Sequence, residues 1–340
     1  MKTLTISLIT GLILFTFPAQ SQYVTKYPEI PRIDVHTHVY NNYPAIGAYL
    51  SLRDQMLSDR KIDMAMWICL GGEAAIDSIT EVSKGRIMTT ISDYSPQRGL
   101  THKAEDIAGY LKKGYVGYKI WQGPYYRKLK EGEKGIKYID DPAHESVFAA
   151  MEKAGMVGAS VHIADPNGPF GNRGKWCADP VEFWREIMGL ERVLQRHPNL
   201  VIIAAHGSWL VCQDAQLDYL RYMLKTYPNF YVDLAATDQY YNLVSRENLR
   251  DLLIEFSDRI LFGTDIGPYA VSAIPGNVTR YAHSFQILET EDVVEAGFFG
   301  SKPTTGLNLP KDVLEKIYYK NAMKLYPGLT ERMRRLGYKV

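Results

Sequence analysis

The segment RIDVHTH, residues 32–38, predicts a short buried strand that ends in two histidines separated by one residue. Residues i and i+2 of a strand point to the same face, so His36 and His38 would present two imidazoles side by side. Imidazole is the commonest neutral metal ligand in proteins. The apolar residues before the pair place it at the carboxyl end of the strand, where a parallel barrel gathers its chemistry. We interpret the pair as metal ligands, with two stacked or solvent-facing histidines as the ordinary alternative.

Further apolar, β-rich runs follow the first at intervals of about 20–40 residues. Each run is short and apolar on both faces, which is typical of strands in a parallel sheet covered by helices. The runs are Met64–Leu70, Arg86–Ser92, Val116–Trp121, Val157–Ile163, Leu200–Ala205, Phe230–Ala235 and Arg259–Gly263.

Segments with helical periodicity separate most of these runs. Asp141-Pro142 and Asp179-Pro180 each combine a capping acid with proline at the first helical position, and Ser245 precedes another helix, Asn248–Phe256. Strands that alternate with helices in this way predict an α/β protein with a single (β/α)8 TIM barrel. A doubly wound open sheet is the competing fold, but no Gly-x-Gly-x-x-Gly motif follows any of the runs.

The first 21 residues differ from the rest of the chain. Lys2 precedes the apolar stretch Leu4–Phe17, which is followed by the small residues of PAQS at 18–21. This order predicts a cleavable signal peptide over residues 1–21, because the apolar stretch is too short for a membrane span. We expect a mature barrel domain over residues 22–340, exported to the periplasm or secreted.

Composition limits the classes of partner. The formal charge of +1 gives no electrostatic argument for binding nucleic acid or an anionic membrane, so we expect a small-molecule substrate and leave self-association open. Three cysteines in an exported chain of 340 residues do not form a disulfide framework. Cys69 is predicted to lie in the core, while a bond between Cys177 and Cys212 is left open.

Unusual polar residues fall at the ends of several apolar runs, namely Lys119, His162, His206 and Asp265. Each has an ordinary alternative: a hydrogen-bonded core histidine, a lysine that reaches out to solvent, or an aspartate that caps a turn. Burying all of them near one point is costly unless a cation or a hydrogen-bond network compensates them. The histidines away from strand ends are expected to be surface residues: His102, His144, His197 and His283.

The chain resembles the amidohydrolase superfamily of metal-dependent barrels through HTH at residues 36–38, His162, His206 and FGTD at residues 262–265. It is most similar to the amidohydrolase-related branch, which includes decarboxylases and lactonases beside true hydrolases. The similarity extends over nearly the whole mature chain, and the helix expected at Val313–Tyr326 also resembles the C-terminal segment of that branch.

The resemblance implies that His36, His38, His162 and Asp265 bind a divalent metal, with Zn2+ expected and Mn2+ as the alternative. Asp265 and His206 would be the catalytic residues. His206 would orient or deprotonate the attacking water, or bind a second metal in a two-metal site. Lys119 would either be carboxylated and bridge two metals or hold an anionic substrate group as an ammonium. We favour one ion.

A divalent cation with an open coordination position acidifies water and polarises a carbonyl, so these residues predict hydrolysis of an ester, lactone or amide bond. Asp265 would accept the water proton, and His206 would stabilise the oxyanion or the hydroxide. One alternative is a nonoxidative decarboxylase of an aromatic or unsaturated carboxylic acid. The other is a binding protein that retains the metal but lacks turnover.

The long loops after the fourth and fifth predicted strands, together with the segment after the sixth, are rich in aromatic residues. The side chains expected to contact substrate are Trp121, Tyr125, Arg173, Trp176 and Trp209. Aromatic faces interleaved with basic groups suit a sugar-like or carboxylated substrate. Ordinary loop packing at the barrel mouth is the alternative interpretation.

Overall fold

A computed structural model describes residues 22–38, 43–71, 76–93, 99–122, 138–167, 180–267, 271–294 and 302–340. The expected signal peptide, Cys177 and three of the expected substrate contacts (Tyr125, Arg173 and Trp176) lie outside these residues. Among the described residues, no helix combines the length and apolar character that crossing a membrane requires.

Each of the predicted apolar runs contains a strand, and each of these strands pairs in parallel with a strand that is next to it in the chain. The third run is divided at Thr90 into two short strands. The strands are β1 (Arg32–Thr37), β2 (Met64–Cys69), β3 (Ile87–Thr89), β4 (Ile91–Asp93), β5 (Gly117–Gln122), β6 (Val157–Ile163), β7 (Ile202–Ala204), β8 (Phe230–Asp233) and β9 (Ile260–Leu261).

These strands form a three-stranded sheet, β1-β2-β3, and a six-stranded sheet, β4 to β9. Main-chain hydrogen bonds cross both junctions between them. Val116 N donates to Thr89 O at 3.0 Å, and Val35 N donates to Phe262 O at 3.0 Å. The parallel α/β architecture is therefore confirmed, whereas the paired strands do not form one continuous closed ladder.

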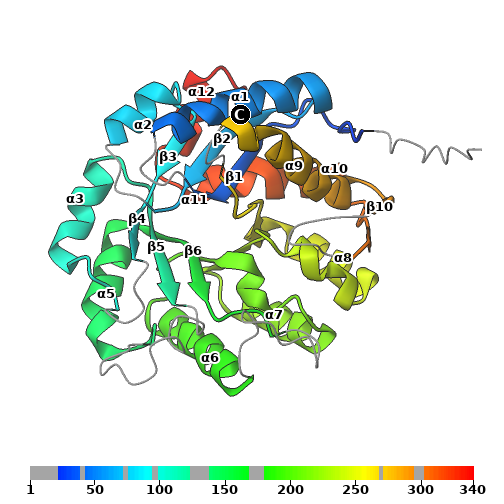
Figure 1. The fold of residues 1–340 in the computed structure, drawn as a ribbon. Coiled ribbons are helices and arrows are strands. Elements are labelled where there is room, and N and C mark those ends of the chain that lie inside the picture. The colour runs from blue at the N-terminus through cyan, green and yellow to red at the C-terminus, as the bar shows by residue number, and fades with distance from the viewer. Residues whose placement is uncertain are drawn as a thin grey trace, which may run out of the picture.

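Helices surround the strands in chain order, as Figure 1 shows. They are α1 (Tyr43–Arg60), α2 (Ile76–Val82), α3 (Ile107–Lys112), α5 (Glu145–Ala154), α6 (Pro180–Arg196), α7 (Asp214–Thr226), α8 (Arg246–Glu255) and α9 (Ile274–Glu289). The predicted caps are confirmed where they are described: Asp141 accepts from Ala143 N at 2.8 Å, and Ser245 Oγ accepts from Asn248 N at 3.2 Å.

The C-terminal segment begins after a small antiparallel pair, β10 (Val293–Val294) with β11 (Thr304–Thr305). The helix expected at Val313–Tyr326 is present as α10 (Lys311–Glu315), a π-helical turn and α11 (Asn321–Leu325), followed by α12 (Leu329–Arg335). Leu329 and Met333 of α12 belong to the same apolar cluster as residues near the strand starts, such as Ile33 and Val116. The C-terminal helices therefore pack against the amino ends of the strands.

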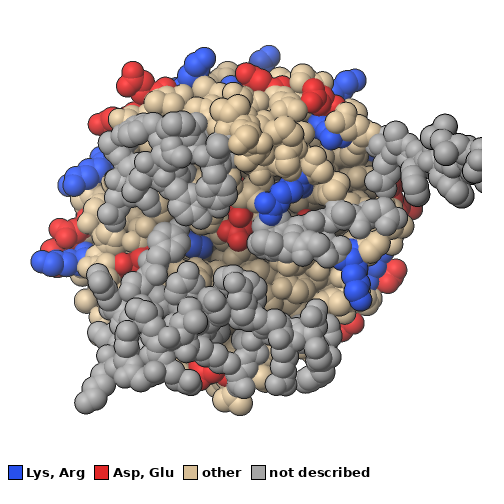
Figure 2. All heavy atoms as spheres, in the orientation of Figure 1, with Lys and Arg blue, Asp and Glu red and all other residues tan. Residues whose placement is uncertain are grey.

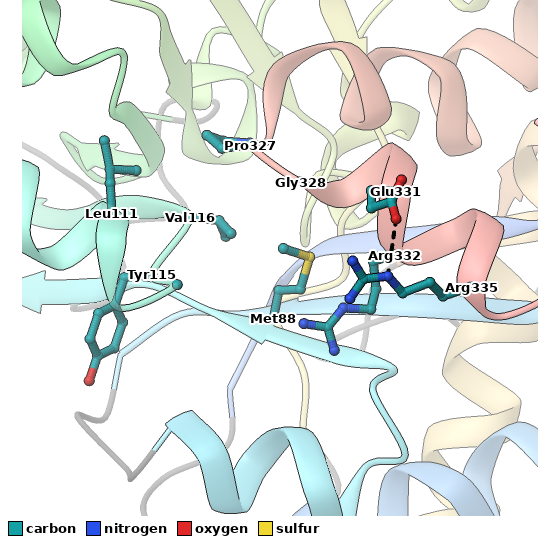
Figure 3. A pocket seen from close by; sticks show the side chains of 10 residues that line it. Met88, Leu111, Tyr115, Val116, Pro327, Gly328, Glu331, Arg332 and Arg335 are labelled. Carbon is teal, nitrogen blue, oxygen red and sulfur yellow. Dashed lines mark hydrogen bonds and ion pairs between the residues drawn. The ribbon is translucent and has the colours of Figure 1, made fainter.

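A cavity of about 330 Å3 lies beside α12, and Figure 3 shows the side chains that line it. They are Met88, Leu111, Gly114, Tyr115, Val116, Pro327, Gly328, Glu331, Arg332 and Arg335. This lining contains no histidine or cysteine, and its one carboxylate, Glu331, pairs with Arg335 at 3.1 Å. The cavity adjoins the start of β5, at the end of the strands opposite to the predicted chemistry.

Two histidines expected at the surface are buried, and for them the sequence prediction is wrong. His144 is 1% exposed, and its ring accepts from Leu100 N and bonds to Ile139 O. His197 is 3% exposed and lies 3.1 Å from Glu145. Each ring has at least one hydrogen-bonding or charged partner from a segment that is distant in sequence, namely Leu100 for His144 and Glu145 for His197. Cys69 is fully buried, as predicted.

Charged side chains on the visible face are mixed. Figure 2 shows the Lys and Arg side chains of the described residues interspersed with Asp and Glu side chains, with no patch of one sign.

A buried ion pair joins the start of β1 to the end of α9. Arg32 and Glu289 have fully buried side chains, and Arg32 Nη2 lies 2.9 Å from Glu289 Oε1. The guanidinium also donates to Ile30 O at 2.6 Å and Thr25 Oγ1 at 2.7 Å, while Tyr318 donates to Glu289 at 3.0 Å. Partners from several segments thus satisfy both charges.

Replacing Glu289 by alanine is expected to lower the free energy of unfolding by about 3–5 kcal/mol, because the substitution leaves the Arg32 charge buried without its counter-ion. Chemical denaturation measures this loss. The control is Glu331→Ala, which removes a carboxylate from a solvent-exposed pair with Arg335 and should change stability little. Equal effects of the two substitutions would contradict the expected importance of the buried pair.

Candidate metal centre

Three predicted ligands meet at the carboxyl end of β1. Asp265 Oδ1 lies 3.2 Å from His36 Nε2 and 2.9 Å from His38 Nε2. One atom from each residue belongs to a group whose members all lie within 4.8 Å of one another. Both imidazole nitrogens therefore face the same carboxylate oxygen, which is the arrangement that a shared cation would require.

The backbone of β1 holds Asp265 in this position. Asp265 N donates to His36 O at 2.7 Å, and Asp265 adopts a left-handed conformation with φ of 62°. The buried carboxylate of Asp34 accepts from Thr264 Oγ1 at 2.5 Å and from Tyr281 OH at 2.5 Å. Burial raises the pKa of Asp34 to about 6, against the opposing effect of these hydrogen bonds. The strand that carries the histidines is thereby joined to the segment that carries the aspartate.

The ring hydrogen bonds of three histidines fix which nitrogen can bind a cation. The Nδ1 atom of His36 lies 3.0 Å from Asp233 Oδ2, that of His38 lies 3.1 Å from Leu70 O, and that of His206 lies 2.7 Å from Ala235 O. These oxygens accept hydrogen bonds, so a ring that binds a cation through the lone pair of Nε2 can keep its hydrogen on Nδ1, where an acceptor already lies.

This donor set fits a divalent transition metal. Neutral imidazole nitrogens with one carboxylate are ligands typical of Zn2+ sites and are also compatible with Mn2+. Burial raises the pKa of Asp265, but the adjacent His36 and His38 outweigh that effect and hold it well below its usual range. Asp265 is consequently an anion that faces two imidazoles.

His162 lines the adjacent cavity and does not belong to the close group formed by His36, His38 and Asp265. Its ring centroid is 4.9 Å from that of His206 and 5.4 Å from that of Trp121. Its Nε2 is buried without a hydrogen bond to any described residue, although Asp165 Oδ1 is 3.4 Å away. A buried nitrogen in this state is consistent with a further ligand position.

Lys119 is buried deep in β5. Its ammonium donates to Ser160 O at 2.6 Å, and the side chain does not line the large cavity at this end of the strands. Burial lowers the pKa of Lys119 to about 8, while Asp265 and Asp233 act in the opposite direction. The Lys119 ammonium therefore interacts electrostatically with Asp265, but its side chain is not among the described residues that line the cavity.

His206 begins a turn with unusual backbone geometry. His206, Gly207, Ser208 and Trp209 all have φ between 54° and 58°, the left-handed region. This region costs a residue with a side chain about 1–2 kcal/mol, so such conformations persist only where surrounding contacts require them. The turn stacks the indole of Trp209 on the imidazole of His206, with centroids 4.3 Å apart and planes inclined by 17°. Burial lowers the pKa of His206 well below its usual value.

A cavity of about 480 Å3 opens beside this group of side chains. Its lining residues are His162, Asp165, Pro166, His206, Trp209, Ala236, Gln239, Tyr240 and Asp265. Of the described residues predicted to contact substrate, Trp209 lines the cavity, whereas Trp121 contacts the His162 ring without lining the cavity. The cavity places an aromatic wall opposite ionisable groups at the carboxyl ends of the strands.

Sequence reasoning missed three buried carboxylates at this centre: Asp34, Asp165 and Asp233. Asp233 is fully buried at the end of β8, and its carboxylate contacts His36 and the backbone of His206. For Asp34 and Asp233 the available signal was a charged residue inside an apolar run, because a buried aspartate requires partners.

A family model described as amidohydrolase matches residues 131–328, which is more than half of the chain. This chain belongs to the amidohydrolase family. Members of the family are metal-dependent, in agreement with the donor set described above. No curated protein matches the chain in sequence.

Several solved structures resemble this amidohydrolase. An uncharacterized TIM-barrel protein from Bordetella bronchiseptica is 15% identical, with a TM-score of 0.54 over 90% of this chain and 100% of that chain. A 5-carboxyvanillate decarboxylase from Novosphingobium aromaticivorans, solved with manganese, is 13% identical, with a TM-score of 0.49 over 89% and 98%. A dihydroorotase from Campylobacter jejuni is 14% identical, with a TM-score of 0.43 over 91% and 84%. At these identities the first likeness supports the TIM-barrel fold, and none assigns a reaction.

Protein purified without chelator is expected to contain a divalent metal, measured by inductively coupled plasma mass spectrometry. His38→Ala should lower cation affinity by more than the roughly 10–100-fold caused by changes outside the ligand shell. The control is His102→Ala, since His102 bonds to Tyr110 and Ser92 away from the three-donor group. Unchanged cation affinity in His38→Ala would contradict the assignment.

Proposed function

We propose that this amidohydrolase is a metal-dependent hydrolase that activates water to cleave an ester, lactone or amide bond in a small substrate. The observation that supports the proposal best is the meeting of His36, His38 and Asp265 beside a cavity of about 480 Å3. These residues would hold the cation, with His162 as a further ligand. The bound cation would supply Lewis acidity to a carbonyl and lower the pKa of a water molecule.

Asp265 is the proposed general base. Its Oδ1 faces both imidazoles of the HTH segment, while its Oδ2 has no hydrogen bond to any described residue. The Asp265 side chain is 30% exposed, compared with 1% for His36, so the carboxylate reaches the cavity while the histidine does not. In this proposal Oδ2 accepts the proton of the attacking water and transfers it to the leaving group.

His206 is proposed to orient the water. Its Nδ1 donates to Ala235 O, so the neutral ring offers a lone pair at Nε2 and no second hydrogen. A ring in that state accepts a hydrogen bond from water, whereas stabilising an oxyanion would require a donor. The geometry therefore favours the water-orienting role over oxyanion stabilisation.

The proposed substrate is a small compound with a flat or ring-shaped apolar face, sugar-like or carboxylated. Trp209 and Tyr240 provide aromatic surface, and Gln239 provides a polar group on the same wall. Among the described lining residues of the cavity, none is Lys or Arg.

A single cation is the proposed stoichiometry. Asp233 and His206 form a second close group with His36, but Asp233 lies on the Nδ1 side of the His36 ring and bonds to main-chain nitrogens. Hydrogen bonds already occupy both oxygens of the Asp233 carboxylate, which argues against a second cation there. Zn2+ is the proposed ion and Mn2+ the alternative. Lys119 is proposed to remain an ammonium.

Asp265→Asn is expected to reduce turnover by about 10²–10⁴-fold, because the amide cannot accept the water proton. Turnover is measured on metal-loaded protein with a panel of lactones, esters and amides. The control is Asp218→Asn, on the exposed face of α7. Full activity of Asp265→Asn with a normal metal content would remove this residue from the mechanism.

The decarboxylase alternative makes a different product. Incubation with aromatic and unsaturated carboxylic acids should release no carbon dioxide, whereas a hydrolysable substrate should give a ring-opened or cleaved product detected by mass spectrometry. Release of carbon dioxide that is lost in Asp265→Asn would contradict the hydrolase proposal and support the decarboxylase alternative. A loaded metal without turnover of any compound in either panel would favour the binding-protein alternative.

Export of the chain is also proposed, on the pattern of residues 1–21. N-terminal sequencing of protein recovered outside the cytoplasm should begin near Gln22. Recovery of the intact Met1 terminus from the cytoplasm would contradict export.

A further inference from the structure

We propose that Asp233 is a positioning residue, which fixes the tautomer of His36 and the backbone of His206 and thereby sets the cation affinity of the centre. The inference rests on the metal centre of the proposed function but concerns a residue outside the ligand set. Asp233 ends β8 and is fully buried.

The two oxygens of Asp233 have different partners. Oδ2 lies 3.0 Å from His36 Nδ1. Oδ1 accepts from His206 N at 3.0 Å and from Ala235 N at 3.1 Å. One carboxylate thus joins a histidine of β1 to the start of the turn that carries the second histidine.

The bond to His36 determines which ring nitrogen is available to a cation. His36 has a carboxylate oxygen beside each ring nitrogen, and the 3.0 Å bond from Nδ1 to Asp233 is shorter than the 3.2 Å separation of Nε2 from Asp265 Oδ1. The carboxylate of Asp233 can only accept, so it favours the neutral His36 tautomer with the hydrogen on Nδ1 and a lone pair on Nε2. That Nε2 atom is the one that faces Asp265. Asp233 would therefore influence cation binding indirectly, because it bonds to Nδ1 of His36 while the cation would bind Nε2 on the opposite side of the ring.

The bonds to the main chain restrain His206 as well. His206 has a left-handed backbone, and its Nδ1 bonds to the carbonyl of Ala235, the residue whose own N–H Asp233 accepts. The His206 ring also lies 4.7 Å from the His36 ring, centroid to centroid. Removing the carboxylate would release both histidines at once.

Asp233 is not itself a convincing ligand, although it belongs to a group of suitable spacing with His36 and His206. A cation bound to its oxygens would displace hydrogen bonds to two main-chain nitrogens and one imidazole. Leaving those buried N–H groups without acceptors is costly, because each loses its hydrogen bond without regaining water.

Asp233→Asn separates the two roles of the side chain. The amide keeps an oxygen for His206 N and Ala235 N, so a purely structural role should survive. Its NH2 group, however, would face His36 Nδ1 and donate to it, which forces the hydrogen of His36 onto Nε2. The variant should fold and lower the affinity for Zn2+ and Mn2+ by about 10–100-fold.

Two measurements test this on the full chain. Isothermal titration of metal-free protein with ZnCl2 and with MnCl2 gives the affinity. Long-range 1H–15N spectra of histidine-labelled, metal-free protein at alkaline pH report the tautomer, and one histidine should change from the Nδ1–H to the Nε2–H form in the variant. The matched control is Asp238→Asn. Asp238 lies in the same connection after β8, and its carboxylate accepts from Ser284 of α9. This substitution should change neither the cation affinity nor the tautomer.

A folded Asp233→Asn protein with unchanged cation affinity or an unchanged His36 tautomer would overturn the proposal. The wild-type spectrum is a test that does not depend on how the variant folds, since His36 with its hydrogen on Nε2 would also overturn it. If neither protein hydrolyses any substrate but the affinity and tautomer change as expected, the proposed reaction fails and the positioning role stands.

Discussion

The buried carboxylate of Asp34 is the constraint on which the rest of the site depends. It accepts from His36 N at 2.9 Å within its own strand, and from the hydroxyls of Thr264 and Tyr281 across the junction between the first and last strands. The two sheets do not pair into a continuous ladder at this junction. Side-chain bonds therefore supplement the few main-chain bonds that bring Asp265 to the two histidines of β1.

The positions of the strands and of most reactive residues follow from the sequence for a local reason. A run of apolar residues identifies a buried strand, and a polar residue at its carboxyl end falls at the barrel mouth, as His206 and Asp265 do. For the HTH segment, the alternation of side chains along a strand was enough to predict that the two imidazoles share a face. Those rules use neighbouring residues alone, which is why they succeed without knowledge of the fold.

Partners of the reactive residues could not be predicted in the same way. Asp233 lies 197 positions from His36, so its place within an apolar run indicates a buried carboxylate but does not identify the residue that it contacts. His144 and His197 looked like surface residues because Leu100 and Glu145, which contact them, lie in other segments of the chain. The left-handed turn at His206–Trp209 contains a single glycine and gives little signal in sequence. For Asp233, His144 and His197 the deciding contact is between segments that only the folded chain brings together.

The stack of Trp209 on His206 couples the aromatic wall of the cavity to the group that would orient water. Both rings belong to one tightly wound turn, so neither can shift without the other. Divergence toward a new substrate by enlarging or shrinking the indole would disturb catalysis at the same time. Related proteins are then expected to change selectivity through Gln239, which borders the same cavity from a different connection, whereas the ring of Tyr240 packs edge-on against Trp209 with centroids 5.8 Å apart.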